Sequence, residues 1–312
     1  MSQPSLEAAL LPTTFVRSAR LAEHLGLDLV LATETFQHTG SFKFRAAMSV
    51  ALSVPHPHVL TASSGNFGHA MARACRLTGK ACTVVMPRTS AQVKVQAVRE
   101  NGATVDLIDV RQVSRAQRVA ELARRHPEAY VASAYDDAFV IAGNATLGRE
   151  LARLSPPPDV VVAPVGGGGL MAGIVRGLAE SHSRAAVVGA EPLQANDAAR
   201  SLRAGELVAD PCEQETLADG ARTVSLGRLN WEILRRGLEG IVEVPEERIV
   251  EAVRLLFAIA NLKAEPTGAL SMAALLTKPE RFRGRRVCCV VSGGNVDPGL
   301  FCRLLTGEVP GA

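Results

Sequence analysis

The sequence has no uninterrupted apolar stretch of about 18 residues, the length that a membrane-spanning helix needs. Residues 1–5 contain no basic region followed by an apolar run, so we expect no signal peptide. The six cysteines include no Cys-x-x-Cys pair, and the neighbours Cys288 and Cys289 lie within an apolar run. This usage is typical of reduced, buried thiols. We therefore expect a soluble, cytoplasmic protein with no membrane partner.

A strong charge of either sign is also lacking. Lys and Arg number 34 and Asp and Glu number 31, so the net charge of +3 gives no electrostatic reason to expect nucleic acid as a partner. The densest basic run, residues 281–286, precedes an apolar strand and is interpreted as a solvated loop. With 312 residues, 47% of them hydrophobic, the chain can bury a large core and is expected to form two domains.

Short β-type runs alternate with helical patterns along most of the chain, which is typical of an α/β protein. Strands are expected at residues 27–31, 59–62, 82–86, 104–108, 130–132, 159–163, 186–190 and 287–291. Helices are expected at residues 18–25, 43–52, 67–77, 93–101, 115–125, 170–181, 230–239 and 246–260. Because the strand at 287–291 is apolar almost throughout, both of its faces should be buried, as in a parallel sheet covered by helices. We expect a small domain at residues 56–136 and a large domain made of residues 1–55 and 137–312.

One short segment, residues 39–45, has the composition of a reactive lysine site. Phe42 and Phe44 flank Lys43, Gly40 permits a tight approach of the chain, and Ser41 is expected to cap the helix that follows. A lysine amine becomes nucleophilic at neutral pH only when the fold desolvates it or places it beside other cations. The alternative from these residues alone is a surface lysine in the first turn of a helix.

Two turns between a strand and a helix could bind an anion. Ser63, Ser64, Gly65 and Asn66 form the first, and four glycines, Gly166, Gly167, Gly168 and Gly169, form the second. Such turns present unpaired backbone N–H groups, and glycines let the backbone close around a phosphate. The second turn lacks the ending of a nucleotide P-loop and the third glycine of a dinucleotide motif. The alternative is that the glycines only let a helix pack closely on a sheet.

A third polar turn, residues 292–295, begins with Ser292 at the end of an apolar strand, where α/β sheets usually place ligands. A lone serine at such a point is otherwise a turn former. Taken together, these segments resemble the fold type II pyridoxal-phosphate enzymes of tryptophan synthase β-like fold, in particular serine/threonine dehydratases (ammonia-lyases) and serine racemases. The likeness extends from about residue 11 to residue 300 and includes residues 39–43, 63–66, 166–169, 191–192, 219–220, 265–269 and 292–295.

The resemblance implies a role for several of these segments. Lys43 would hold pyridoxal 5'-phosphate as a Schiff base and act as the catalytic base at the substrate Cα. The four glycines would bind the cofactor phosphate, Asn66 its phenolic oxygen and Ser292 its pyridine nitrogen. The turn from Ser63 to Asn66 would hold the substrate carboxylate, with Ser64 as the acid or base on the face opposite Lys43. A serine at the pyridine nitrogen favours elimination over transamination, because it need not keep the ring protonated.

The resemblance also implies a divalent cation in the segment that follows residue 190. Glu191 and Asp197 would supply carboxylate oxygens and Ala195 a backbone carbonyl. Such all-oxygen ligation suits Mg²⁺ or Ca²⁺, with Mn²⁺ as a further candidate, and not zinc. Without the resemblance, two carboxylates at this spacing are interpreted as ordinary surface acids.

The expected reaction is β-elimination (dehydration and deamination) of a hydroxy amino acid such as L-serine or L-threonine, giving a 2-keto acid and ammonia. Serine racemase and 3-hydroxyaspartate dehydratase are the alternatives, and both use the same motifs. A β-replacement synthase fits these motifs less well, and the retention of Lys43 argues against a non-catalytic protein. The resemblance further implies a homodimer, and we expect no C-terminal regulatory domain.

Some residues depart from the pattern of the family. Phe67 stands where a histidine is common, Ala46 replaces a frequent glycine, and Arg149 stands where glutamate is frequent. Residues 144–146 read Asn-Ala-Thr in place of the more usual Gln-Gly-Thr. Because Phe67 adjoins the carboxylate turn, it affects the expected substrate preference more than cofactor binding.

Overall fold

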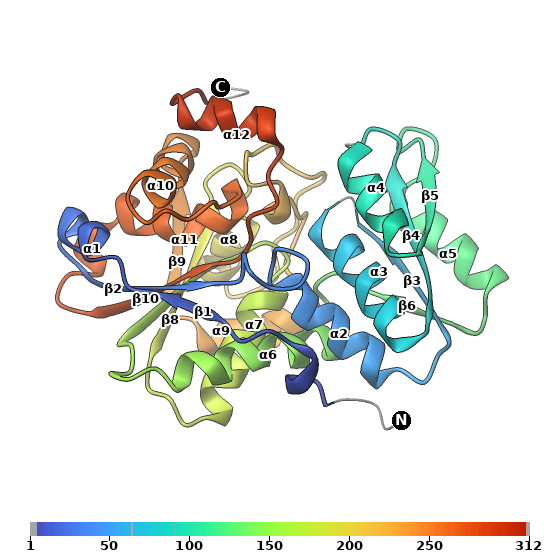
Figure 1. Cartoon of the computed structure of the whole chain (residues 1–312), viewed down its shortest axis with the longest axis horizontal. Coiled ribbons are helices and arrows are strands. Elements are labelled where there is room, and N and C mark those ends of the chain that lie inside the picture. Colours follow the sequence, from blue (N-terminus) through green and yellow to red (C-terminus); the bar gives the residue numbers. More distant parts are fainter. Residues whose placement is uncertain (1–4, 64, 91, 310–312) are drawn as a thin grey trace.

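The computed structural model describes residues 5–309 except Ser64 and Ala91. It is an α/β structure with a six-stranded and a four-stranded sheet that lie side by side, each flanked by helices (Figure 1). This architecture confirms the predicted fold class. In the described residues no helix is long and apolar enough to span a bilayer.

The six-stranded sheet has the order β1-β2-β10-β7-β8-β9. The strands are β1 (Thr14–Val16), β2 (Asp28–Thr33), β7 (Val160–Pro164), β8 (Ala186–Pro192), β9 (Gly240–Val244) and β10 (Arg286–Val291). β1 pairs with β2 antiparallel, whereas all other pairs are parallel. Val287 of β10 is in register with Leu29 of β2 on one side and Val160 of β7 on the other, so this apolar strand lies inside the sheet, and both of its pairings are parallel, as predicted.

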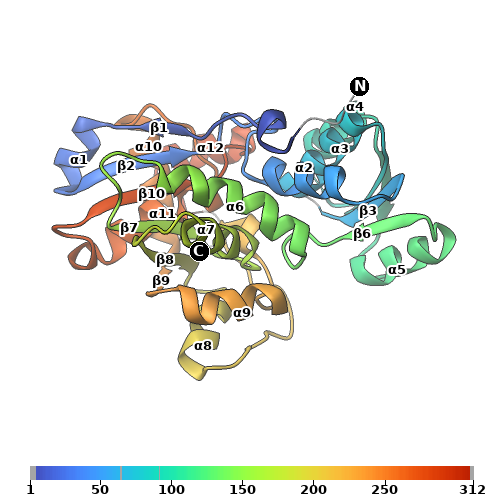
Figure 2. The same cartoon turned by 90° about the horizontal axis from the view of Figure 1, so that it is seen from below.

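Helices cover both faces of the six-stranded sheet (Figure 2). Alternate residues of β7 point to opposite faces: Val160 and Val162 share a core with α10 and α11, and Val161 and Ala163 share one with α6, α7 and α9. The helices are α6 (Ala138–Ala152), α7 (Gly169–Glu180), α9 (Arg228–Gly237), α10 (Glu246–Ala258) and α11 (Pro266–Thr277). Burial on both faces explains why these strands are apolar at nearly every position.

The four-stranded sheet is fully parallel in the order β5-β4-β3-β6. Its strands are β3 (His58–Ala62), β4 (Ala81–Pro87), β5 (Thr104–Ile108) and β6 (Ala129–Ala132). Figure 2 shows α3 (Asn66–Thr78) and α4 (Gln92–Glu100) on one face and α5 (Arg115–Arg125) on the other. All four strands lie within residues 56–136, the predicted small domain. This placement agrees with the predicted boundaries, which stay a prediction.

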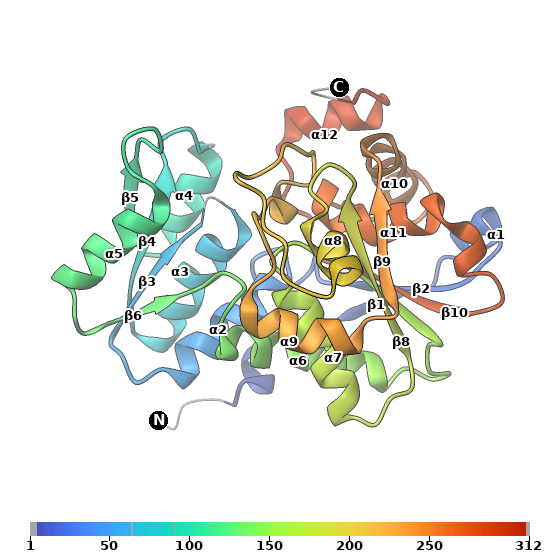
Figure 3. The ribbon, with the colours of Figure 1, turned by 180° about the vertical axis from the view of Figure 1, so that it is seen from behind.

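The remaining helices connect or border the two sheets. They are α1 (Ala19–Leu25), α2 (Lys43–Ser53), α8 (Asp197–Ala204) and α12 (Pro298–Leu305), with short 3-10 turns at Glu7–Ala9, Asp219–Ala221 and Pro279–Arg281. α2 packs on both α3 and α6, so it joins the cores beside the two sheets. The chain between α8 and α9 reaches the four-stranded sheet side (Figure 3), where Asp219 pairs with Lys94 at 3.1 Å and Glu213 pairs with Arg115.

All eight predicted strands and eight predicted helices are present, with ends shifted by a few residues. The sequence pattern missed β1, β9, α6, α8, α11 and α12. α11 is buried on all sides, so its apolar residues show no helical period. Two expectations are corrected. The Ser41 hydroxyl makes no hydrogen bond within the described residues, so it does not cap α2. The six cysteines are free, but Cys212 and Cys302 are exposed.

Candidate active site

The segment before Lys43 is held against the turn that follows β10. The Phe42 N–H donates to the Ser292 carbonyl at 2.9 Å, and the Gly294 N–H donates to the Gly40 carbonyl at 3.0 Å. Gly40 has a positive φ of 73°, and a Cβ at this position would overlap the side chain of Asn295. Only glycine at position 40 therefore lets the two segments come this close. They lie about 250 residues apart in the sequence, and backbone pairing between strands requires no proximity along the chain.

Lys43 is the first residue of α2 and keeps part of its surface open to solvent. Its Nζ donates to the Ala134 carbonyl at 2.9 Å and lies 5.0 Å and 5.7 Å from the ring centres of Phe42 and Phe67. Desolvation by this surrounding protein lowers the pKa of Lys43 to about 8, against the opposing attraction of Glu265. A substantial fraction of the amine is thus neutral near physiological pH, as a nucleophile requires.

Asn66, the first residue of α3, links the four-stranded sheet to this site. Its Nδ2 donates to Glu265 Oε1 at 2.7 Å, and its Oδ1 accepts from Asn295 Nδ2 at 2.8 Å. Glu265 is 5% exposed, and burial together with the charge of Asp219 raises its pKa to about 8, although Asn66 acts in the opposite direction. Glu265 had no predicted role. Two sequence signals pointed to it: Glu265 directly precedes the proline of a buried helix, and residues 265–269 are among the segments that carry the family resemblance.

The four glycines connect β7 to α7. Two of their carbonyls accept side-chain amides: Gly167 accepts from Asn230 Nδ2 at 2.6 Å, and Gly169 accepts from Asn144 Nδ2 at 2.9 Å. Their N–H groups donate to no backbone carbonyl of the described residues, and Gly168, with φ 88°, provides no capping side chain. A Cβ at Gly166 would lie 2.9 Å from the Ala221 Cα. The turn is therefore tightly packed at Gly166 and presents N–H groups at a helix N-terminus, an arrangement that suits an anion.

Residues 134–135 connect Lys43 to the glycine turn. The Ala134 carbonyl accepts from Lys43, and the Tyr135 carbonyl accepts from Asn230 Nδ2 at 3.0 Å, the same amide that holds Gly167. The structure thus brings Lys43, Asn66, Ser292 and the glycine turn to one junction between the two sheets. Ser292 is buried, with 1% of its surface exposed.

The turn predicted to bind a carboxylate lies directly before α3. The Ser63 N–H donates to the Val85 carbonyl at 3.2 Å, and the Ser63 hydroxyl accepts from the Gly65 N–H at 3.3 Å. Gly65 precedes α3 and offers no side-chain cap, so donors of the first turn of the helix stay available to a ligand. Ser64 lies outside the described residues, and its assignment as an acid or base stays a prediction.

The predicted cation ligands lie between β8 and α8. Both oxygens of Glu191 accept backbone N–H groups, from Ala198 and Ala199, at 2.9 Å each. The carboxylate of Asp197 is buried and has no hydrogen-bond partner within the described residues. Burial and the charge of Asp210 raise the pKa of Asp197 to about 7. Ala195 is fully buried in the same loop. An unpaired buried carboxylate is costly, and a bound cation would relieve that cost.

Comparison with known proteins agrees with this geometry. A family model described as pyridoxal-phosphate dependent enzyme matches residues 6–293, and the chain belongs to this family, with the fold of its type II members. The chain is 36% identical over 281 residues to β-hydroxyaspartate dehydratase of Paracoccus denitrificans (89% of this chain, 88% of the relative). It is 34% identical over 297 residues to serine racemase of Bos taurus (91% and 88%).

A solved structure with the same fold is threonine deaminase of T.th., with a TM-score of 0.84 and 39% identity, where the match covers 92% of each chain. The cofactor of the family is therefore pyridoxal phosphate.

Proposed function

We propose that this chain catalyses the β-elimination of water from a hydroxy amino acid and releases a 2-keto acid and ammonia. The observation that carries the proposal is the Lys43 amine, whose pKa is lowered to about 8 at the junction that also holds Asn66 and Ser292. The relatives support the same chemistry, since a β-hydroxyaspartate dehydratase and a threonine deaminase are among them. A small amino acid is the partner, and the six free cysteines support a cytoplasmic location.

The residues present fit the cofactor. The free N–H groups of Gly166–Gly169 suit the phosphate, and Lys43, whose amine would receive the aldehyde, is half-buried. Asn66 would approach the phenolic oxygen and Ser292 the ring nitrogen. When bound, pyridoxal phosphate accepts the electron pair that the substrate Cα retains after its proton leaves.

The chain itself supplies the proton transfers and the orientation. In its neutral form Lys43 takes the Cα proton, and the rings of Phe42 and Phe67 limit the access of water to its amine. The Cα–H and Cβ–O bonds break, the hydroxyl leaves as water, and hydrolysis of the C–N bond then gives the keto acid and ammonia. Backbone donors of the Ser63–Asn66 turn would hold the substrate carboxylate, which fixes the Cα–H bond toward Lys43.

A divalent cation, Mg²⁺ in the first place, is part of the proposal, with ligands from Glu191, Asp197 and the Ala195 carbonyl. The unpaired carboxylate of Asp197 supports it. We expect MgCl₂ to raise the melting temperature of the wild type and of Asp159→Asn, an exposed control. Asp197→Asn should lose this shift. An unchanged shift in Asp197→Asn would exclude this ligand set.

A homodimer is the proposed assembly. Phe15, Phe36 and Leu11 leave a third or more of their surface exposed (37%, 59% and 40%), which supports an interface near β1. Light scattering during size-exclusion chromatography, at several protein concentrations, tests the proposed dimer. The expected result is the mass of two chains. A single-chain mass at all concentrations would refute it.

Racemisation of serine is the second candidate, supported by the 34% identity to a serine racemase. One substrate panel separates the candidates: L-serine, D-serine, L-threonine and both diastereomers of 3-hydroxyaspartate, each with and without chelator. Keto acid and enantiomer are measured in the same samples. Keto acid as the main product supports the lyase, and interconversion of the serine enantiomers without keto acid supports the racemase. Absence of a visible band that borohydride discharges would refute both.

A further inference from the structure

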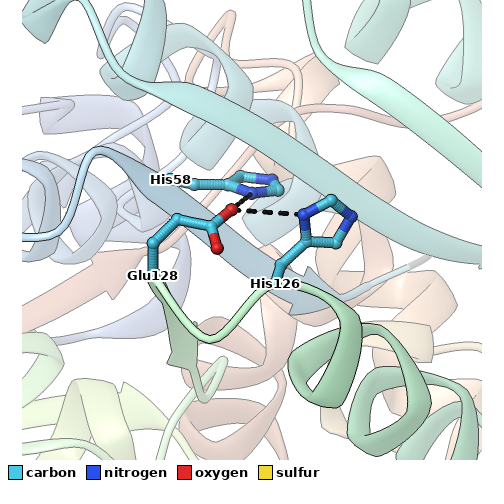
Figure 4. Close-up of side chains that lie close together, drawn as sticks. All are labelled: His58, His126 and Glu128. Carbon is cyan, nitrogen blue, oxygen red and sulfur yellow. Dashed lines mark hydrogen bonds and ion pairs between the residues drawn. The ribbon is translucent and has the colours of Figure 1, made fainter.

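Three potential ligands lie together at the edge of the four-stranded sheet. His58 is the first residue of β3, His126 follows α5, and Glu128 precedes β6. Glu128 Oε1 lies 3.2 Å from Nδ1 of His126 and 3.8 Å from Nδ1 of His58, and Figure 4 shows both rings turned toward this carboxylate. One ligand atom from each residue fits within 4.8 Å of the others. The parallel register, which pairs His58 with Ala129, places the three at one end of the sheet.

The donor set has a definite chemical preference. Two imidazole nitrogens and one carboxylate oxygen are the ligands of many zinc sites that keep an open position, whereas Mg²⁺ and Ca²⁺ prefer oxygen alone. In a tetrahedral zinc site with bonds of roughly 2.0–2.1 Å, the donor atoms lie about 3.3 Å apart. The side chains of His126 and Glu128 are 44% and 49% exposed, so small rotations of both can close the remaining distance.

His58 is prepared for this role by its second nitrogen. Its Nε2 lies 2.9 Å from Thr83 Oγ1 on β4. In the tautomer that donates from Nε2, the lone pair of Nδ1 faces Glu128, and such a partner on the far nitrogen is typical of metal-bound histidine.

Ion pairs of Glu128 with His126 and with His58 would explain all three residues only if both rings were protonated. The ring of His58 also lies against that of His126, with centroids 5.2 Å apart and planes at 80°. Two protonated imidazoles this close would repel each other, whereas a shared cation would be held by both. The arrangement is therefore better suited to a metal ion than to protons.

The geometry points to a binding site for a divalent transition-metal ion, Zn²⁺ in the first place, at His58, His126 and Glu128. β3 leads from His58 to the Ser63–Asn66 turn, so the site lies roughly 17 Å from that turn at 3.3 Å per residue. The ion takes no part in the elimination. It joins the start of β3 to the connection between α5 and β6 and thereby stabilises the four-stranded sheet. This inference does not depend on the proposed activity.

The test is to titrate the metal-free holoenzyme with ZnCl₂. Calorimetry measures the binding, and the melting temperature is recorded with and without Zn²⁺. His126→Ala and Glu128→Gln change exposed side chains, so both variants should fold. Each variant is expected to bind one Zn²⁺ fewer than the wild type, or to bind it at least about tenfold more weakly. The matched control is His24→Ala, an exposed histidine in the last turn of α1. Asp197 and the exposed cysteines Cys212 and Cys302 are other side chains that could bind Zn²⁺. Asp197→Asn and a Cys212→Ser/Cys302→Ser variant should therefore bind Zn²⁺ as the wild type does.

Thr83→Val sharpens the test, because it removes the hydroxyl that orients His58 without touching a ligand. We expect an affinity roughly 10- to 100-fold weaker than that of the wild type. Zn²⁺ should raise the melting temperature of the wild type and of His24→Ala but not of His126→Ala. The inference is overturned if the wild type binds no Zn²⁺ at micromolar concentration. Equal binding by His126→Ala, Glu128→Gln and wild type would also overturn it.

Discussion

Lys43 and Arg45 are two cations in the same turn of α2, and their surroundings shift their pKa values in opposite directions. Arg45 is 0% exposed and donates to Glu34 Oε2 at 2.7 Å, to Glu150 Oε1 at 2.7 Å and to Thr146 Oγ1 at 2.9 Å. Burial opposes its charge, but Glu34 and Glu150 outweigh burial and raise the pKa of Arg45 above its usual range. Lys43 has a neutral carbonyl as its hydrogen-bond partner, and its pKa falls to about 8.

The helix explains how two neighbours reach such different surroundings. Residues i and i+2 point about 200° apart around a helix axis, so Lys43 and Arg45 face opposite sides of α2. Arg45 meets the carboxylates that follow β2 and lie in α6, whereas Lys43 faces the junction with the four-stranded sheet. Removing one partner of a paired buried cation destabilises the structure, while an unpaired cation is available for chemistry.

The largest expected effect is on turnover. Lys43→Met removes the amine that takes the Cα proton, so release of keto acid should fall by about 10³-fold or more. Lys80→Met is the matched control, because Lys80 also donates to a backbone carbonyl, that of His56 at 2.8 Å, and has no proposed role. Its turnover should stay within about twofold of the wild type. Full turnover by Lys43→Met would refute the proposed role.

The second effect is on stability. Arg45→Met leaves Glu34 and Glu150 without their cation, and urea unfolding should show a loss of about 3–5 kcal/mol in the free energy of unfolding. Arg149→Met removes partly exposed pairs with Glu180 and Glu7 and should cost less than about 1 kcal/mol. Adding Glu34→Gln to Arg45→Met should recover part of the loss. A loss below about 1 kcal/mol for Arg45→Met would contradict the comparison.

The third effect has the opposite sign. Lys43→Met should raise the free energy of unfolding of the cofactor-free protein by up to about 3 kcal/mol near pH 6.5, because the folded state then no longer holds a protonated amine there. The pKa is lower in the folded state, so the cost of the charge is complete below pH 8 and disappears between pH 8 and 10.5. The gain measured by urea unfolding at pH 9.5 should therefore be smaller. An equal gain at both pH values would rule out the charge as its cause.

The smallest effect concerns Glu265, whose charge raises the pKa of Lys43. Only the neutral amine captures the cofactor aldehyde, so the rate at which cofactor-free protein develops its visible band should rise with pH through about 8. Glu265→Gln should move this midpoint to lower pH by less than about one unit. Glu239→Gln, which lies far along the chain beside Arg285, serves as the control. A midpoint moved to higher pH would contradict the assigned interaction.

The sequence by itself determined the alternation of strands and helices, because side-chain periodicity and burial on both faces are local properties of each segment. It also indicated which segments to propose for the chemistry: Lys43, the Ser63–Asn66 turn, the four glycines and Ser292, which follow strands or precede helices. Only tertiary structure decided which side chains meet. Ser41 does not cap its helix, and Glu265, Asn144 and Asn230 join the site through contacts that no local pattern encodes.

The same holds for the two cations of α2. Helix periodicity places Lys43 and Arg45 on opposite sides of α2, but it does not say what each side meets. Their pKa values are set by groups that are distant in sequence, up to Glu265, which lies 222 residues (265 minus 43) from Lys43. Desolvation and charge pairing depend on distances in space, which exist only once the two sheets have packed against α2.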